Sequence, residues 1–301
     1  MRTEDDRAPE RIQYLLAMFE SIESNSADFY DLAAEGSELV EDDHQLAPFQ
    51  ASHLVGHCLA VSIDALRTVR LVLRKDDAGG LRVPMIGAYP LLRTVIEASS
   101  LAVWLLAPAD QTERLKRVLR TRMDDILHDD RFVVTMTAQV EGEDRSARSR
   151  KQKTRRANST DVRAKKRLLR DLAAAAGINS DEINTGLPGF GYIIEQAAPE
   201  LGLDPNLTRG TWSFVSGLTH PSVSRSLMGS SIEWVNDDSQ ALITANLDNL
   251  AWAMDAALNA LLTALRLTSE RGGRPEIDWT PGPDFPPPSD YTHMSRPSDQ
   301  A

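Results

Sequence analysis

Residues 84–106 read PMIGAYPLLRTVIEASSLAVWLL, and the only two charges in this stretch are Arg93 and Glu97 near its middle. Twenty-three residues of this composition are long enough to span a bilayer as a helix. However, both charges lie mid-segment, Pro90 interrupts the first half, and a chain of net charge −11 offers no second span. We therefore expect a buried central helix of a globular protein, and no membrane contact.

The segments around this stretch also predict helices. Apolar residues recur at helical spacing over residues 48–74 and again over residues 110–140. A long C-terminal helix is expected over about residues 239–270, because apolar residues there form a near-heptad seam. The seam consists of Ile243, Leu247, Leu250, Met254, Ala257, Leu261 and Leu265. No segment has a convincing period-two alternation, so the sequence predicts an all-α fold, a single bundle of about seven to nine helices.

Length and punctuation indicate one domain with a tail. The 301 residues suit one large domain or two modest ones. We expect a helical domain over residues 1–271 and a proline-rich, disordered tail over residues 272–301. Inside the domain, residues 142–161 carry many arginines and almost no apolar side chains, which predicts a mobile basic loop.

Composition excludes several classes of protein. With 42% hydrophobic and 26% charged residues, the chain is neither a disordered protein nor a collagen, and its one cysteine, Cys58, cannot form an internal disulfide. A single cysteine and an acidic start without an apolar core predict a cytoplasmic protein. No motif calls for a cofactor or a resident metal, so none is expected.

Charge is distributed very unevenly along the chain. Residues 114–170 hold 18 of the 33 basic residues and 8 acidic ones, a net of +10, which leaves −21 for the remainder. Such a segment attracts nucleic acid through counterion release, and we expect RNA as the partner. The alternative is a solvated loop that balances an acidic body. The candidate contacts are Lys151, Lys153, Arg155, Arg156, Lys165, Lys166, Arg167 and Arg170.

Arg93 and Glu97 are the first candidates for chemistry. They are four residues apart, so on a helix they share a face and can pair. In an apolar segment such charges need further partners, and the candidates are His57, Asp64 and His220. The set is interpreted either as a structural ion-pair network or as a catalytic pocket containing Arg93, Glu97 and His220.

Two other spacings involve histidines. His53 and His57 are four residues apart, a spacing at which two imidazoles can meet one metal, but the HLVGH segment lacks the glutamate of HExxH. The other is Arg122 followed by His128, which resembles the Arg-x4–6-His pattern of nucleases in the HEPN superfamily. That resemblance implies that Arg122 neutralises a phosphate while His128 performs acid–base work in RNA cleavage.

A broader resemblance covers about residues 48–265. It rests on the Arg93-x3-Glu97 segment, on Trp104, on the arginines at 114 and 117, and on the Ser216–His220 segment. These features are similar to uncharacterised helical proteins of actinobacteria and their phages, near the DUF5677 and HEPN-like families. The resemblance implies a helical bundle in a defence or RNA-related setting.

Two functional hypotheses follow. The first is a non-enzymatic scaffold or regulatory interaction protein, with homodimer formation through the C-terminal helix. The second is a HEPN-like, metal-independent RNase or RNA-binding effector.

Overall fold

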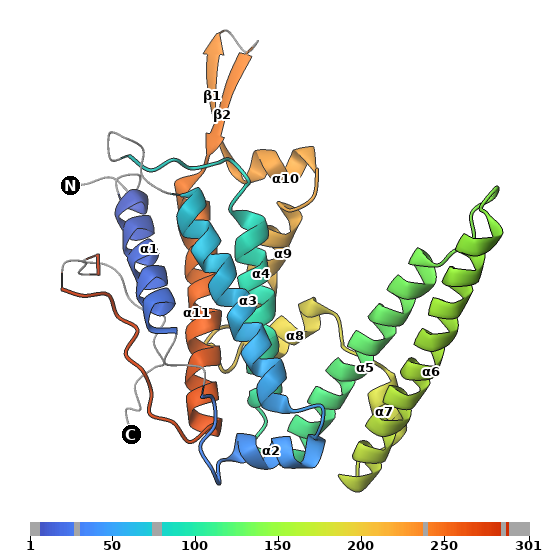
Figure 1. The fold of residues 1–301 in the computed structure, drawn as a ribbon. Helices are drawn as coiled ribbons and strands as arrows, with labels where there is room; N and C mark the ends of the chain where they lie inside the picture. Colours follow the sequence, from blue (N-terminus) through green and yellow to red (C-terminus); the bar gives the residue numbers. More distant parts are fainter. Residues whose placement is uncertain (1–6, 27–30, 74–79, 237–239, 284–286, 289–301) are drawn as a thin grey trace. The chain divides into compact units, whose positions relative to one another are not determined.

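The computed structural model describes residues 7–26, 31–73, 80–236, 240–283 and 287–288. Helix accounts for 69% of it and strand for 5% (Figure 1). The expectation of a mostly helical protein is therefore confirmed. Within the described residues, however, there are eleven helices instead of seven to nine, and a two-stranded antiparallel sheet that was not expected.

The chain divides into two compact units, where one domain over residues 1–271 was expected. Unit 1 comprises Met1–Glu38, Leu54–Ala107 and Gly189–Ala301, and unit 2 comprises Leu39–His53 and Pro108–Pro188. Unit 1 holds α1 (Ala8–Asn25), most of α3 (Ala51–Val72), α4 (Tyr89–Leu106), α8 (Phe190–Ala197), α9 (Pro205–Gly217), α10 (Val223–Met228), β1 (Ser230–Asn236), β2 (Gln240–Ala245) and α11 (Leu247–Arg271). Unit 2 holds most of α2 (Glu38–Leu46), α5 (Gln111–Met136), α6 (Arg145–Ala175) and α7 (Ser180–Asn184).

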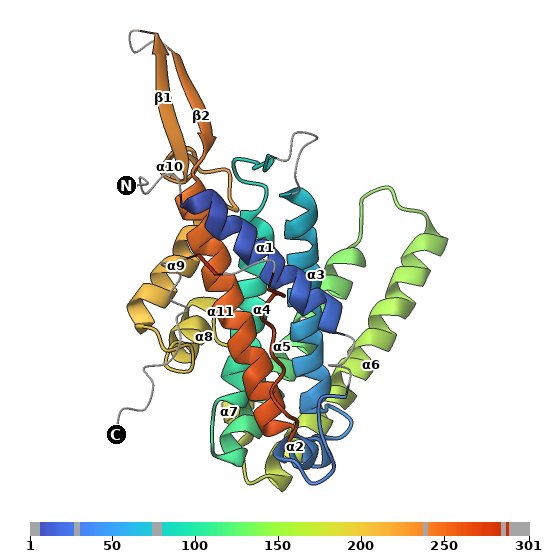
Figure 2. The same ribbon diagram turned by 90° about the vertical axis from the view of Figure 1, so that its left-hand side faces the viewer.

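Helix α4 is the buried centre of unit 1, as the sequence predicted. Twelve of its eighteen residues are buried, and it packs along α11 and against α8 and α9 (Figure 2). The helix begins at Tyr89 because Pro90 occupies its first turn, where a missing backbone N–H costs nothing. Pro90 is thus a helix start and not an interruption.

Helix α11 contributes the other half of this core. Leu250, Met254, Ala257, Leu261 and Leu265 of the near-heptad seam are each at most 2% exposed. Among the described helices only α11 is long and apolar enough to cross a bilayer, and 72% of its apolar window is buried inside the structure. The seam that predicted a homodimer therefore packs against α1 and α4 of the same chain.

The hairpin of β1 and β2 replaces the start of the expected C-terminal helix. Residues 240–245 form β2, and α11 begins only after Asn246, whose side chain accepts a hydrogen bond from the Asn249 backbone N–H. The prediction of helix is wrong over residues 240–245, because β-branched residues in both strands, together with Trp234 in β1, favour paired strands.

The prediction of a mobile loop over residues 142–161 is also wrong, since residues 145–161 belong to the 31-residue helix α6. Between Asp144 and Ala176 the sequence has no glycine or proline and is rich in Ala, Arg and Lys, which are good helix formers. Asp144 caps the helix by accepting hydrogen bonds from the backbone N–H groups of Ser146 and Ala147. A segment with few apolar residues has no apolar face to bury, but it can still form a helix.

Part of the expected tail is ordered against unit 1. Trp279 is 8% exposed, and the carbonyl of Thr280 accepts a hydrogen bond of 3.4 Å from Ser21 Oγ on α1. Residues 272–283 therefore differ from the disorder expected over residues 272–301. The remainder of that range lies outside the described residues, except for residues 287–288.

Unit 2 contains a buried ion pair between α2 and the start of α5. Asp42 and Arg114 have side chains that are each 3% exposed. Arg114 donates from Nε to Asp42 Oδ2 at 2.8 Å and from Nη2 to Oδ1 at 3.1 Å. This two-point contact fixes α2 against α5, which in turn packs along α6.

Candidate functional site

The basic residues of α6 form the strongest concentration of one charge in the described chain. The helix carries twelve lysines and arginines against two aspartates, and ten of the twelve basic residues are exposed. At 1.5 Å per residue its 31 residues extend over roughly 46 Å. Only Val162, Leu169 and Ala173 are buried, so most of the helix surface faces solvent.

A hollow of about 630 Å³ lies along the N-terminal half of α6. At 100° per residue, Arg148, Arg155, Arg156 and Arg163 fall within an arc of about 100° on the helix, and all four line this hollow. Its other lining residues are Thr137, Gln139, Lys151, Gln152, Ser159 and Thr160. We call this feature the basic groove. It combines guanidinium groups with hydroxyl and amide side chains, all of which can donate hydrogen bonds to an anion.

Of the five basic residues that line the groove, only Lys151 forms an ion pair with a described residue. Lys151 pairs with Glu143 at 2.7 Å and donates to the carbonyl of Ala138 at 2.9 Å. In the part of the chain that the structure describes, no carboxylate pairs with Arg148, Arg155, Arg156 or Arg163. The groove therefore holds four arginines whose charge is not balanced by an ion pair.

The remaining predicted contact residues lie elsewhere on the same helix. Lys165 pairs with Asp161 at 2.8 Å, and Arg170 donates to the Asn184 side chain at 3.2 Å. Lys153 and Arg167 are exposed, whereas Lys166 is half-buried. Sequence reasoning missed Arg148 and Arg163 as groove residues. Helical periodicity through residues 145–163 would have placed them beside Arg155 and Arg156.

Arg93 and Glu97 pair on α4 as their spacing predicted, with Nε and Oε1 2.8 Å apart. Their further partners come from α9 and the residues after it. Trp212 Nε1 donates to Glu97 Oε1 at 2.9 Å, and Arg93 Nη1 donates to Thr219 Oγ1 at 3.0 Å. The expected partners were His57, Asp64 and His220, and no signal in the sequence singled out Trp212 or Thr219. This network joins two helices of unit 1.

His220 lies near this network in sequence but does not join it. Its side chain is exposed, and within the described residues no hydrogen bond or ion pair connects it to Glu97. The structure therefore brings Arg93 to the Ser216–Thr219 turn without assembling an Arg93–Glu97–His220 set.

Arg122 and His128 on α5 do not form a joint site either. Arg122 lies 3.7 Å from Asp125 and donates to the carbonyl of Gln50 at 3.4 Å. His128 lies 3.3 Å from Asp124 and is 66% exposed. Six residues of helix turn the two side chains about 120° apart, so they face different partners.

The histidines of α3 show no metal site. His53 and His57 are both exposed, as is Asp64. No group of three or more His, Cys, Asp or Glu residues in the described part of the chain is arranged to hold a metal ion.

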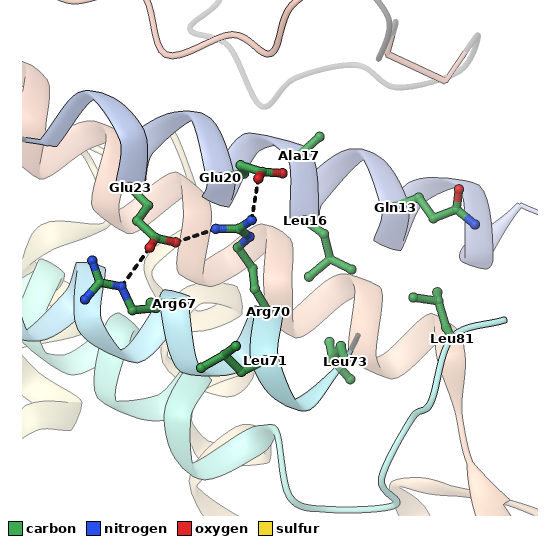
Figure 3. A pocket seen from close by; sticks show the side chains of 10 residues that line it. All are labelled: Gln13, Leu16, Ala17, Glu20, Glu23, Arg67, Arg70, Leu71, Leu73 and Leu81. Atoms are coloured by element: carbon green, nitrogen blue, oxygen red, sulfur yellow. Dashed lines mark hydrogen bonds and ion pairs between the residues drawn. The ribbon is translucent and has the colours of Figure 1, made fainter. Parts of the chain in front are cut away.

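A second hollow, of about 530 Å³, lies between α1 and α3 in unit 1 (Figure 3). Leu16, Ala17 and Leu73 belong to its apolar wall. At one end Arg70 pairs with both Glu20 and Glu23, and Arg67 donates to Glu23 at 2.7 Å.

Burial alone would raise the pKa of the Glu23 carboxyl. The hydrogen bond from Arg67 and the charge of Arg70 outweigh that effect and hold this pKa below its usual range. Two carboxylates and two guanidinium groups therefore balance at this end, and the pocket carries no net charge to select an ionic ligand.

Comparison with known proteins adds no relative, because no family model, no curated protein and no solved structure matches the chain.

Proposed function

We propose that this chain is a non-enzymatic, cytoplasmic interaction protein that binds nucleic acid, with RNA as the expected partner, through the basic groove of α6. The observation that carries the proposal is the set of four groove arginines without a carboxylate partner. Arginine presents a planar fork of donors that matches phosphate oxygens, so the groove has the chemistry of a phosphodiester backbone site.

Charge distribution supports an external partner over internal balance. Residues 124–144 include seven Asp and Glu residues, yet among the described residues the only ion pair between one of them and a groove cation is Glu143–Lys151. Cations that served only to offset the acidic body would be expected to lie against its carboxylates. Instead the groove arginines lie along an exposed face, where they can neutralise the phosphates of a polyanion and release the counterions condensed on it.

The composition of α6 favours backbone contact over base recognition. The sequence has no aromatic residue between Phe132 and Phe190, so the groove offers no ring on which a base can stack. Contacts to phosphate position a protein on nucleic acid without reading its sequence. We therefore expect binding with little sequence preference and a strong dependence on salt.

The proposal is non-enzymatic because the two candidate catalytic sets are not assembled in one chain. Arg122 and His128 face different partners, and no hydrogen bond or ion pair joins His220 to Glu97 within the described residues. The resemblance to HEPN-like proteins stays part of the proposal. In this chain a hydrogen bond of 3.0 Å, from Arg93 to Thr219, joins two of the segments on which that resemblance rests.

Fluorescence anisotropy with labelled RNA tests this function. A 20-base-pair RNA duplex, a single-stranded RNA and a DNA duplex are each titrated with the full chain between 50 and 200 mM salt. Four phosphate contacts on a duplex give a log–log salt slope of about −3.6, which is roughly a 150-fold loss of affinity over that range.

Two variants with the same change in charge locate the site. Arg148→Gln/Arg155→Gln/Arg156→Gln removes three groove arginines, and we expect a salt slope shallower by about 2.7. Arg150→Gln/Lys153→Gln/Lys165→Gln removes three cations from other faces of the same helix and should retain most of the affinity. Equal losses in both variants would show that total charge, and not the groove, governs binding.

Other outcomes decide the remaining parts of the proposal. Absence of binding at 50 mM salt, or binding that does not weaken up to 200 mM, would overturn the proposal. If the DNA duplex binds more tightly than RNA, DNA and not RNA is the partner. RNA fragments that appear with the wild-type chain, and are lost in Arg122→Ala, His128→Ala or His220→Ala, would establish an RNase.

A further inference from the structure

Large apolar side chains are exposed together on the β1–β2 hairpin and on α10 at its base. Eight residues between positions 223 and 243 are 38–76% exposed, almost half of the large apolar residues exposed in the described chain. They are Val223, Leu227, Met228, Ile232, Trp234, Val235, Leu242 and Ile243. Both views show the hairpin extending beyond the helices of unit 1 (Figures 1 and 2).

The strand register divides the hairpin into two unlike faces. Ile232 pairs with Ile243 and Trp234 with Ala241, so these four side chains share one face, which we call the apolar face. The pairs Ser231–Thr244 and Glu233–Leu242 lie on the opposite face, which carries two hydroxyl groups, a carboxylate and the exposed side chain of Leu242. The apolar face is therefore the uncharged face of the hairpin and the more apolar of the two.

Within the described chain this apolar face has no core to pack against. The substantial packing of the hairpin onto other elements is between β1 and the short helix α10. An isolated two-stranded hairpin is at best marginally stable in water, and it needs further strands or a packed face. Natural edge strands are commonly protected by lysine or proline, and neither residue occurs in β1 or β2.

We infer that the apolar face of the hairpin packs against the same face of a second copy of this chain. If this face is covered in every folded molecule, its partner must be as abundant as the chain itself. A second copy of the chain meets this condition. A twofold axis places Ile232, Trp234 and Ile243 of one copy against the same uncharged residues of the other. The hairpin part of this contact buries no charge, because Glu233 lies on the opposite face.

The available area is sufficient for such a contact. Ile232, Trp234, Ile243 and the three exposed residues of α10 leave an apolar area on the order of 600 Å² per copy. Specific interfaces begin at about 600 Å² per partner, so we expect a dimer of moderate affinity.

The charge of the region argues against a lipid surface or nucleic acid as its partner. Residues 223–245 contain one arginine and three acidic residues, a net of −2. Anionic lipid headgroups and phosphodiesters attract clusters of basic residues, which this segment lacks. The dimer contact is thus chemically distinct from the basic groove.

Sedimentation or light scattering of the full chain between 1 and 100 µM tests the inference. We expect the mass to rise to twice the 33.2 kDa of one chain. Ile232→Thr/Trp234→Thr keeps strand propensity but removes the apolar contact, and it should stay monomeric over this range. Leu207→Gln, which changes a residue that is 52% exposed on α9, is the matched control and should dimerise like the wild type.

Cross-linking tests the same contact without replacing the apolar residues of the hairpin, so the hairpin itself is kept. The lone Cys58 is buried, so a cysteine introduced on the hairpin supplies the reactive thiol. A short bismaleimide should link two copies through Ala241→Cys on the apolar face, and much less through Thr244→Cys on the opposite face. A wild-type chain that is monomeric at 100 µM, or equal cross-linking from the two faces, would overturn the inference.

Discussion

The buried pair of Asp42 and Arg114 gives the sharpest prediction about stability. Replacing Asp42 by alanine leaves the Arg114 guanidinium, 3% exposed, without its carboxylate. Two of its hydrogen bonds, at 2.8 and 3.1 Å, are lost, while those to the carbonyls of Pro108 and Ala109 remain. Breaking a buried pair in this way costs about 3–5 kcal/mol, because the remaining charge is desolvated and uncompensated.

Hydrogen exchange measured peptide by peptide is the appropriate assay, since a chain of two compact units need not unfold in one step. A loss of 3–5 kcal/mol corresponds to protection lower by a factor of about 150 to 5,000 in α2 and in the first turns of α5. The apolar double variant Asp42→Leu/Arg114→Met should recover most of this protection, because it removes both charges together.

An exposed pair in the same unit is the control. Lys165→Ala removes the contact with Asp161, whose side chain is 57% exposed, and it should change protection by about twofold or less. Protection in Asp42→Ala within tenfold of the wild type would refute the reasoning. So would a double variant as damaged as the single one, since the cost would then not come from an uncompensated charge.

Two further predictions concern unit 1. A Cβ at Gly272 would lie 1.9 Å from the carbonyl oxygen of Leu32, so Gly272→Ala should lower the free energy of unfolding by about 1–3 kcal/mol. Gly210 has open space around it, so Gly210→Ala should raise that free energy by up to about 1 kcal/mol. Urea unfolding measures both, and equal midpoints for the two variants would contradict this. Burial raises the pKa of the Tyr89 hydroxyl to about 12. Because the folded chain then holds this proton more tightly than the unfolded chain, the contribution of Tyr89 to stability is present below pH 10. It falls by about 1.4 kcal/mol per unit between pH 10 and 12. Ultraviolet titration of the wild type against Tyr89→Phe measures it, and a Tyr89 that ionises near pH 10 would disprove it.

Local sequence patterns determined several features without further help. The apolar stretch before Leu106 predicted a buried helix, and α4 is that helix. The four-residue spacing of Arg93 and Glu97 predicted their ion pair, which forms at 2.8 Å. These features depend on the periodicity of one helix and on charges one turn apart, so the sequence contains all the information that they need.

Other errors arose where a local pattern supports two structures. Residues 142–161 have almost no apolar side chains, which fits a loop or a solvated helix, and helix-forming residues with an Asp144 cap decided for the helix. Residues 240–245 fit both a heptad seam and a strand. Their pairing with residues 230–236 decided for the hairpin, which depends on contacts that no single window contains.

The tertiary structure alone decided which distant residues meet. Nothing in the sequence links Asp42 to Arg114 or Trp212 to Glu97, and nothing in it indicates that His220 does not bond to Glu97. The folding of the whole chain sets these contacts. The same holds for the use of each apolar surface, since the α11 seam is buried within one chain while the hairpin face is exposed. The sequence by itself determined a helical, unevenly charged protein, whereas the tertiary structure determined which of its charged and apolar faces remain available for partners.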